Sequence, residues 1–316
     1  MSLGQAKPIV GGTSAGTHAY PFAVYLSIET QPSWHAVCGG TLVSRKHVVT
    51  AGHCVHHAPS PEAVKLGVGH AHVKHQQRRV ARKISVHPQF DKRTLANDIA
   101  IIELDKDVQE NEHAHRIPVY FGDVPAGATV TTMGWGITSN LPGARTVSAM
   151  NKVDLMVAEP GLCRNVDGAF IDNNGPFVCT STQPGNHDEC NGDSGSPAVI
   201  TLNNGRIHRY RHGNRRTRTA ELGDMHLVAL TSYGDNQSHD EHPPCGDPAG
   251  FGFSTHVAYY HEFIQNATGL SRQQLEEPVR LDRLATADHV SAAFQPQVVW
   301  LNSVIALVAV LVLMCK

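Results

Sequence analysis

The chain has 316 residues, of which 41% are hydrophobic and 17% are charged, and this composition excludes a mostly disordered protein. Lysine and arginine total 26, aspartate and glutamate total 28, and the formal net charge is −2. This near balance argues against nucleic acid as a partner, because proteins that bind it usually carry a basic excess. The 28 glycines and 18 prolines predict frequent turns and few long helices.

Short apolar runs predict a fold built mainly of strands. Residues 1–8 come first and lack the apolar core of a signal peptide. From Ile9 to about Ala267 the runs are rich in β-branched residues and are separated by Gly, Pro, Asn and Ser, a pattern typical of a sandwich or barrel. The runs include residues 22–26, 41–43, 47–50, 99–102 and 227–230.

One arginine-rich segment and two histidine clusters interrupt this pattern without predicting a site. Residues 206–218 contain six arginines; a solvated loop is the favoured interpretation and an anion-binding patch is the alternative. The histidine clusters at residues 56–57 and 70–75 lack the paired ligand spacing of a structural zinc site, so we expect no metal.

One helix is predicted near the end of the strand-rich region. Val257, Tyr260, Phe263 and Ile264 recur at helical spacing within residues 255–266. Thr255 is suited to cap the N-terminus of this helix.

The composition changes after Gly269. Residues 270–297 are polar and predict a linker, and residues 298–316 form an apolar tail. A helix over the 18 residues from 298 to 315 would span about 27 Å, enough for a bilayer core. The alternative is the signal for a GPI anchor, since small residues at 285–287 precede a polar spacer. Either one implies possible membrane attachment through the C-terminal tail.

Four short segments together indicate nucleophilic catalysis. They are IVGG at residues 9–12, TAGHC at 50–54, NDIAII at 97–102 and CNGDSGSP at 190–197. A serine hydroxyl is a poor nucleophile at neutral pH unless an imidazole takes its proton, and a buried carboxylate fixes the tautomer of that imidazole. Ser194, His53 and Asp98 supply the three groups.

With these residues in the order His, Asp, Ser, the chain resembles the chymotrypsin/trypsin family of serine proteases over roughly residues 9–267. GWG at 134–136 and SYG at 232–234 match family segments too. The resemblance implies an all-β fold of two antiparallel six-stranded β-barrels with a C-terminal helix. It implies a peptidase domain over residues 9–269 that hydrolyses protein or peptide substrates with no cofactor.

The same segments also predict which residues bind the substrate's carbonyl oxygen and its backbone. The amides of Gly192 and Ser194 would form the oxyanion hole, where losing one donor typically costs about 10²–10³ in rate. By the family resemblance, Ser232, Tyr233 and Gly234 would bind an extended substrate as an added strand.

The resemblance also implies a specificity pocket. Asp188 lies six residues before Ser194, where an acidic side chain at the pocket floor resembles trypsin and would favour cleavage after Arg or Lys. Gly234 and Gly252 correspond to the glycines of the pocket wall. Glu189 departs from the common pattern, adds negative charge and is expected to narrow the pocket.

Activation in the family requires a new N-terminus. Ile9 would insert its ammonium group and pair with Asp193, so residues 1–8 would be a short propeptide or a truncated segment. Pro8 precedes Ile9, whereas the usual cut follows Arg or Lys, so the activating protease is unidentified. Residues 66–80 align with the calcium loop of the family but contain no acidic residue, and we expect no calcium dependence.

The seven cysteines indicate an oxidising compartment. Six cysteines allow 15 connectivities, and the family resemblance selects three pairs and leaves Cys315 in the tail. An extracellular or cell-surface location is therefore expected, although residues 1–8 carry no signal sequence. The implied pairs are Cys38–Cys54, Cys163–Cys179 and Cys190–Cys245.

Two other functions are alternatives to a catalytic protease. The first is a non-catalytic family member that acts as a binding or inhibitor module; such proteins usually lose a triad residue, and this chain keeps all three. The second is an α/β hydrolase, which has the chain order Ser, acid, His on a parallel sheet and is disfavoured here.

Overall fold

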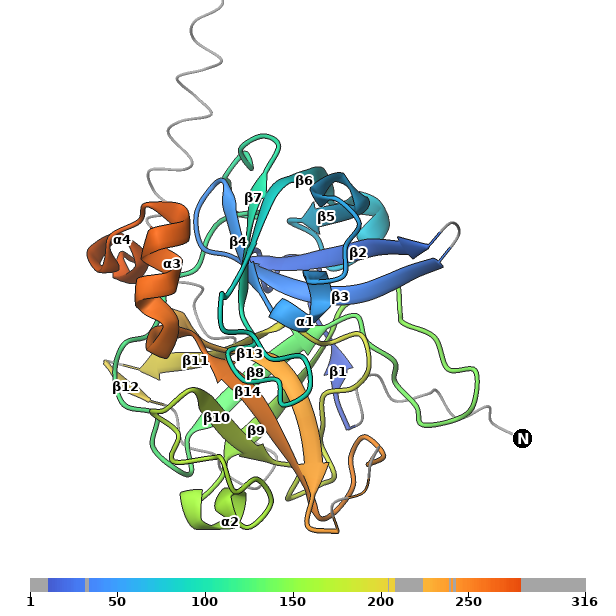
Figure 1. Ribbon diagram of the computed structural model, residues 1–316, viewed down its shortest axis with the longest axis vertical. Coiled ribbons are helices and arrows are strands. Elements are labelled where there is room, and N and C mark those ends of the chain that lie inside the picture. Colours follow the sequence, from blue (N-terminus) through green and yellow to red (C-terminus); the bar gives the residue numbers. More distant parts are fainter. Residues whose placement is uncertain are drawn as a thin grey trace, which may run out of the picture. The chain divides into compact units, whose positions relative to one another are not determined.

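The structure is a computed structural model that describes residues 11–31, 34–203, 205–207, 224–238, 240 and 243–279. Figure 1 shows these residues as ribbons coloured along the sequence. Ile9, most of the arginine-rich segment and the apolar tail 298–316 lie outside the described residues.

The N-terminal half of the chain forms a closed antiparallel barrel, in blue to teal in Figure 1. Its strands pair in the order β2-β3-β4-β7-β6-β5. Valine, leucine and isoleucine side chains of these strands fill the barrel interior. The strands are β2 (Ala23–Gln31), β3 (Trp34–Leu42), β4 (His47–Thr50), β5 (Val64–Val68), β6 (Gln77–Val86) and β7 (Ala100–Leu104).

The second half forms another six-stranded ring. β8 pairs with β9 and β11, and the ring continues through β10, β14 and β13, all antiparallel. Along β9 every second residue is buried, as expected for a strand with one face on the core. The strands are β8 (Thr129–Gly134), β9 (Asn151–Val157), β10 (Phe177–Ser181), β11 (Pro197–Asn203), β13 (Met225–Asn236) and β14 (Gly250–His256). Two short strands add to this ring, β1 (Thr13–Ser14) on β9 and β12 (Arg206–Ile207) on β11.

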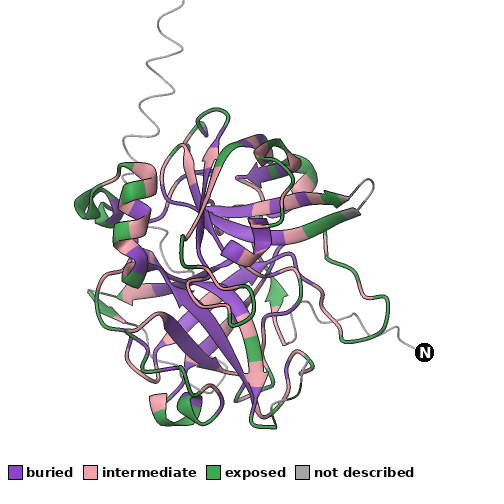
Figure 2. Ribbon diagram, in the orientation of Figure 1, coloured by how far each residue is buried: buried purple, intermediate pink, exposed green. Residues whose placement is uncertain are grey.

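The predicted fold of two antiparallel six-stranded barrels is therefore confirmed. A shared core joins the barrels, because Val49 and Ile101 of the first pack in one cluster with Met133 and Leu227 of the second. Figure 2 shows the buried residues concentrated along the strands. Trp135 lies in this shared core at 1% exposure.

The C-terminal helix begins later than the sequence predicts. β14 runs through His256, a 3-10 turn η4 follows (Val257–Tyr260), and the helix α3 covers His261–Thr268. Thr255 is not a helix cap: it lies inside β14, and its hydroxyl donates a hydrogen bond to the carbonyl of Asp98 at 2.9 Å. β14 pairs with strands on both sides, and this pairing overrides the local helix signal.

The segment predicted as a linker starts with a short helix, α4 (Arg272–Glu276). Ser271 caps the helix, Leu275 is 2% exposed, and the amide of Val119 donates to the carbonyl of Leu275 at 2.8 Å. The first part of this segment is thus packed against the barrels. Within the part of the chain that the structure describes, no helix has the length and apolar character needed to cross a membrane.

Other short helices lie in the loops. They are α1 (Gly52–Val55), η1 (Pro61–Ala63), η2 (Val73–His75) and α2 (Pro160–Arg164). The three disulfides implied by the family resemblance are present, and each typically stabilises a fold by about 2–4 kcal/mol. They join Cys38 to Cys54, Cys163 to Cys179 and Cys190 to Cys245.

Candidate active site

His53 and Asp98 meet at the end of the first barrel. His53 lies in α1, directly after β4, and Asp98 lies in the turn before β7. Because β4 and β7 pair side by side, the chain segments after one and before the other are neighbours. The Nδ1 atom of His53 lies 2.7 Å from Asp98 Oδ2, and its backbone amide donates to Oδ1, also at 2.7 Å.

Asp98 is completely buried and held by further donors. The hydroxyl of Ser232, on β13 of the second barrel, donates to Asp98 Oδ2 at 2.6 Å. This carboxylate therefore has three hydrogen-bond donors although it is removed from water, which compensates the cost of burying a charge. The sequence predicts only a substrate-binding role for Ser232, because no local pattern reveals a contact between barrels.

Ser194 lies in the turn before β11, and backbone hydrogen bonds fix this turn. Gly39 donates to the carbonyl of Ser194 at 2.8 Å, and Gly195 donates to the carbonyl of Thr231 at 2.7 Å. Gly195 has a φ of +75°, and a Cβ atom there would lie 2.3 Å from Thr50 Oγ1. The turn therefore requires glycine for conformation and for space.

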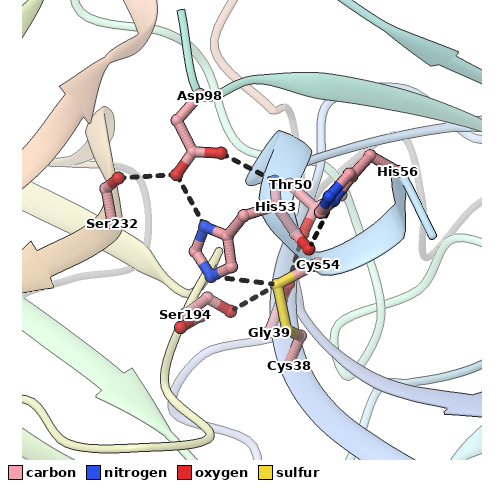
Figure 3. The surroundings of a disulfide bond; sticks show 9 residues. All are labelled: Cys38, Gly39, Thr50, His53, Cys54, His56, Asp98, Ser194 and Ser232. Carbon is pink, nitrogen blue, oxygen red and sulfur yellow. Dashed lines mark hydrogen bonds and ion pairs between the residues drawn. A yellow bond between two sulfur atoms is a disulfide. The ribbon is translucent and has the colours of Figure 1, made fainter. Parts of the chain in front are cut away.

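The Ser194 side chain lies beside the Nε2 edge of the His53 ring (Figure 3). Cys54 Sγ lies 3.8 Å from that Nε2 and 3.6 Å from the carbonyl oxygen of Ser194, so both residues contact one sulfur. Among the described residues, the Ser194 hydroxyl makes no hydrogen bond, to His53 or to any other group. In enzymes without a bound substrate, hydrogen bonds between catalytic groups are often long and shorten only in the reacting complex.

The amides of Gly192 and Ser194 are unused donors. Neither donates a hydrogen bond to any residue that the structure describes. Gly192 has a φ of +96°, and a Cβ atom there would lie 2.8 Å from the Thr146 side chain. The turn thus holds two amides without a protein acceptor near Ser194, which is the chemistry that a developing oxyanion needs.

Asp193 points away from the solvent into the interior. It is 1% exposed, and its carboxylate accepts from the amides of Gly136 at 2.8 Å and Cys190 at 3.1 Å. Burial raises the pKa of Asp193 to about 7, although these amide donors oppose the shift. A Cβ atom on Gly134 or Gly136 would approach this carboxylate within 2.4 Å, so the predicted GWG segment makes room for it.

A cavity of about 390 Å³ opens beside Ser194. Gly234 and Gly252 stand directly opposite each other on β13 and β14, and both line the cavity. Asp188 lines it too and accepts from the amide of Gly246 at 2.8 Å. Burial, and next the neighbouring Glu189, raise the pKa of Asp188 to about 7, while the Gly246 amide opposes the shift.

Tyr233 forms part of the same wall. Its ring stacks on Phe253 with the centroids 5.0 Å apart, and its hydroxyl donates to Asp167 Oδ2 at 2.5 Å. Burial, followed by the Asp167 carboxylate, raises the pKa of this hydroxyl above its ordinary value. The phenol therefore stays neutral and is fixed in place.

The histidine clusters are more extensive than the sequence indicates. His70 contacts His75 and also His18, with ring centroids 4.9 Å and 5.1 Å apart, and His18 stacks on His113 at 3.8 Å. Within the described ranges, the only group of three potential metal ligands with adjacent ligand atoms is Cys38, His53 and Cys54. Its two cysteines form a disulfide and are not available to a metal.

Comparison with known proteins agrees with this architecture. The model of a family described as Trypsin matches residues 9–264. The chain belongs to the trypsin family. It is 28% identical over 265 residues to a trypsin of Phaedon cochleariae, covering 82% of this chain and 88% of that protein. It is 29% identical over 229 residues to a chymase of Rattus norvegicus, covering 66% of this chain and 89% of the chymase. It is also 29% identical over 281 residues to serine protease 56 of Homo sapiens, covering 88% of this chain and 41% of that protein.

The family relatives carry different protease names, so the bond that this chain would cleave has to be argued from its own pocket. The structure brings together most of the predicted site residues, namely His53, Asp98, Gly192, Ser194, Asp188, Ser232, Tyr233, Gly234 and Gly252. Asp193 lies behind them in the interior, and Ile9 is outside the described residues. The contacts that the sequence did not reveal are those of Ser232 and Thr255 with Asp98.

Proposed function

We propose that the chain is a serine endopeptidase that hydrolyses peptide bonds through an acyl-enzyme. His53 Nε2 takes the Ser194 proton as the hydroxyl attacks the carbonyl carbon, then gives it to the leaving amine. Water next gives a proton to Nε2 and attacks the acyl group, and the proton returns to Ser194 as the acid leaves. The observation that carries the proposal is the 2.7 Å contact between His53 Nδ1 and the buried Asp98 carboxylate. That contact keeps the proton on Nδ1 and leaves Nε2 as the base.

The amides of Gly192 and Ser194 stabilise the oxyanion in this mechanism. Each is a backbone donor with no other described acceptor, so neither has to give up a protein hydrogen bond to bind the substrate oxygen. Preorganised donors of this kind lower the barrier without reorganisation during the reaction.

Residues 232–234 bind the substrate backbone as an added strand. β13 pairs with β11 only through Leu230, whereas Tyr233 and Gly234 pair only with β14. Among the described strands, this part of β13 therefore has one edge without a strand partner, and an extended peptide can pair with it.

Asp188 gives the enzyme its preference for Arg or Lys before the scissile bond. A carboxylate in a half-enclosed cavity is costly without a cation, and a substrate cation supplies one. We expect amide substrates with Arg or Lys to be cleaved much faster than those with Phe. Replacing Asp188 by Ser should reduce kcat/KM for Arg substrates by about 10- to 150-fold, the equivalent of one charge-assisted hydrogen bond. Unchanged specificity in this variant, or a wild-type preference for Phe, would contradict the assignment.

Activation depends on a charge partner for Asp193. This buried carboxylate has amide donors but forms no ion pair within the described part of the chain, and the ammonium group of Ile9 supplies the missing cation. N-terminal sequencing of active protein should find Ile9 first. Full activity with Met1 still attached would contradict this step.

The three disulfides support an oxidising location, extracellular or on the cell surface. Proteins and peptides are the proposed substrates, and the apolar tail is the proposed route of membrane attachment. Release of the protein from membranes by a phospholipase that cleaves GPI anchors would identify the tail as an anchor signal.

A fluorophosphonate probe separates the enzyme from the non-catalytic alternative. The probe should label the wild-type chain on Ser194, label the His53→Ala variant far more slowly, and not label Ser194→Ala. A folded wild-type chain that is not labelled would favour the binding or inhibitor module.

A further inference from the structure

Two segments of the chain carry the acceptor sequence for N-linked glycans, Asn-X-Ser/Thr with X other than proline. They are Asn236-Gln237-Ser238 and Asn266-Ala267-Thr268. The pattern is short and common by chance, so it does not by itself show which asparagine is modified. The structure separates the two, because Asn236 is buried and Asn266 is exposed.

Asn236 is the last residue of β13, and it is 1% exposed. Its Nδ2 donates to Asp240 Oδ2 at 2.8 Å and to Asp247 Oδ2 at 2.9 Å. Its Oδ1 accepts from the backbone amides of Ser238 at 3.1 Å and Asp240 at 3.2 Å. An amide side chain has two N–H donors and two acceptor lone pairs, so every hydrogen-bonding position of Asn236 is used.

These contacts leave no place for a glycan on Asn236 in the folded chain. Attachment replaces one hydrogen of Nδ2 by a sugar carbon, so only one of the two carboxylates, Asp240 or Asp247, could keep its donor. A glycan is also a bulky polar group that has to lie at the surface. Modification of Asn236 would therefore require its side chain to leave the interior and the segment after β13 to move with it.

Asn266 lies in the last turn of α3 and is exposed. α3 packs against the shared core through Ile264, which is 1% exposed, with Phe263 and Ala267 beside it. Asn266 follows the exposed Glu262 by four positions, so the two share a side of the helix that is turned away from this core. Figure 1 shows α3 at the outside of the barrels. Within the described part of the chain, the Asn266 side chain makes no hydrogen bond that a glycan would break.

The surroundings of Asn266 also leave the candidate active site open. None of the residues that line the cavity beside Ser194 belongs to α3. The hydroxyl of Thr268, the third residue of the acceptor sequence, donates to the carbonyl of Ile264 at 2.7 Å within α3. A glycan on Asn266 thus extends into the solvent without covering the cavity.

We propose that the folded, secreted chain carries an N-linked glycan on Asn266 and none on Asn236. The proposal rests on the proposed extracellular location, because the sugar donor, an oligosaccharide joined to a lipid pyrophosphate, belongs to the secretory pathway. A transferase of the host joins Asn266 Nδ2 to the anomeric carbon of the sugar. The bond from that carbon to the pyrophosphate oxygen breaks, and the lipid pyrophosphate leaves with the electron pair. The nitrogen loses one proton, and nothing is oxidised or reduced.

Peptide mass spectrometry of the wild-type chain tests both halves of the proposal. The full chain is directed into the secretory pathway of mammalian cells by a cleavable leader, collected, denatured and treated with peptide N-glycosidase F. This enzyme converts a glycosylated asparagine to aspartate, and an untreated sample measures spontaneous deamidation. After treatment, the peptide with position 266 should contain aspartate, and the peptide with Asn236 should still contain asparagine.

Gel mobility of four variants checks the assignment. The wild-type chain should shift by one glycan on treatment, and Asn266→Gln should not shift. Thr268→Ser keeps the hydroxyl of the acceptor sequence and should retain the glycan, whereas Thr268→Val should lose it. Ser238→Ala is the matched control, because it destroys the other acceptor sequence while its backbone amide can still donate to Asn236; it should shift as the wild type does. Asn266→Gln should keep the wild-type kcat/KM.

An unmodified Asn266 in a secreted, folded chain would overturn the inference and leave the proposed location intact. A glycan on Asn236 in such a chain would also overturn it. The decisive measurement uses the wild-type chain, so a variant that fails to fold does not affect it. If Asn266 is glycosylated in the leader-directed chain but the natural protein is found in the cytosol with free cysteines, the proposed location is wrong and the assignment of the acceptor site holds.

Discussion

Replacing Asp98 by Asn removes one negative charge at the point where the two barrels meet. The carboxylate accepts three hydrogen bonds, two from His53 and one from Ser232. An asparagine whose oxygen keeps the bond to the His53 amide turns its NH₂ group toward Nδ1 and the Ser232 hydroxyl. Nδ1 must then accept instead of donate, so the ring proton moves to Nε2 and the base is lost.

The expected magnitude follows from this change of tautomer. In Ser-His-Asp enzymes the equivalent loss lowers kcat by about 10⁴-fold, and we expect the same order for Asp98→Asn. Ser232→Ala is the matched comparison because it keeps the charge and the tautomer and removes one hydrogen bond to Asp98 Oδ2. That bond is worth about 1.5–3 kcal/mol, so kcat should fall by at most about 150-fold.

The assay is kcat on an arginine amide substrate over pH 6–9, with thermal melting to verify that each variant is folded. Asp105→Asn, which changes an exposed carboxylate of the first barrel, should retain wild-type kcat. Activity of Asp98→Asn within tenfold of the wild type, or a loss in Ser232→Ala as large as that in Asp98→Asn, would refute the role given to the carboxylate.

Three further outcomes concern the fold around the site. Gly195→Ala should destabilise the chain by about 2–5 kcal/mol in chemical denaturation, because its φ is +75° and its Cβ atom would lie 2.3 Å from Thr50 Oγ1; an unchanged midpoint would contradict this. Burial, and then His18, lower the pKa of His70 below 6.5, so the folded chain binds a proton at this ring less readily than the unfolded chain does. The free energy of unfolding should therefore fall as the pH decreases through 6.5. His70→Gln should reduce that fall in melting curves at about pH 7.5 and about pH 5.5, and an identical fall in this variant would contradict the assignment. EDTA should leave the melting temperature unchanged, because residues 66–80 contain no acidic side chain, and a lower value in EDTA would reveal a bound cation.

Local sequence patterns predict the strands of this protein well and the helix start poorly. The run 47–50 coincides with β4, because β-branched residues between turn signals have few alternatives. Thr255 has the residue type of a helix cap, yet it lies in β14, whose partners on both sides come from distant parts of the chain. Tertiary pairing decides such a boundary, and one sequence without its partners does not contain that information.

At the candidate site, too, the sequence predicts the residue types but not the contacts between distant segments. The sequence predicts His53, Asp98 and Ser194, because nucleophilic catalysis needs these residue types and each lies in a recognisable short segment. The contact of Ser232 with Asp98 crosses between the barrels over 134 positions, so no spacing rule predicts it. His18 and His70 are also distant in the sequence, and their rings meet for the same reason. The position of the Glu189 carboxylate likewise depends on Thr231, from another strand.

The central claim is that Ser194, His53 and Asp98 act as one proton-transfer relay. The most direct test is intact mass spectrometry after mixing the activated chain with an arginine-like ester that acylates rapidly and deacylates slowly. The account predicts one acyl group per active chain, located on Ser194 and absent from Ser194→Ala. Turnover of the ester with no acyl group on Ser194, or an acyl group on another residue, would contradict it.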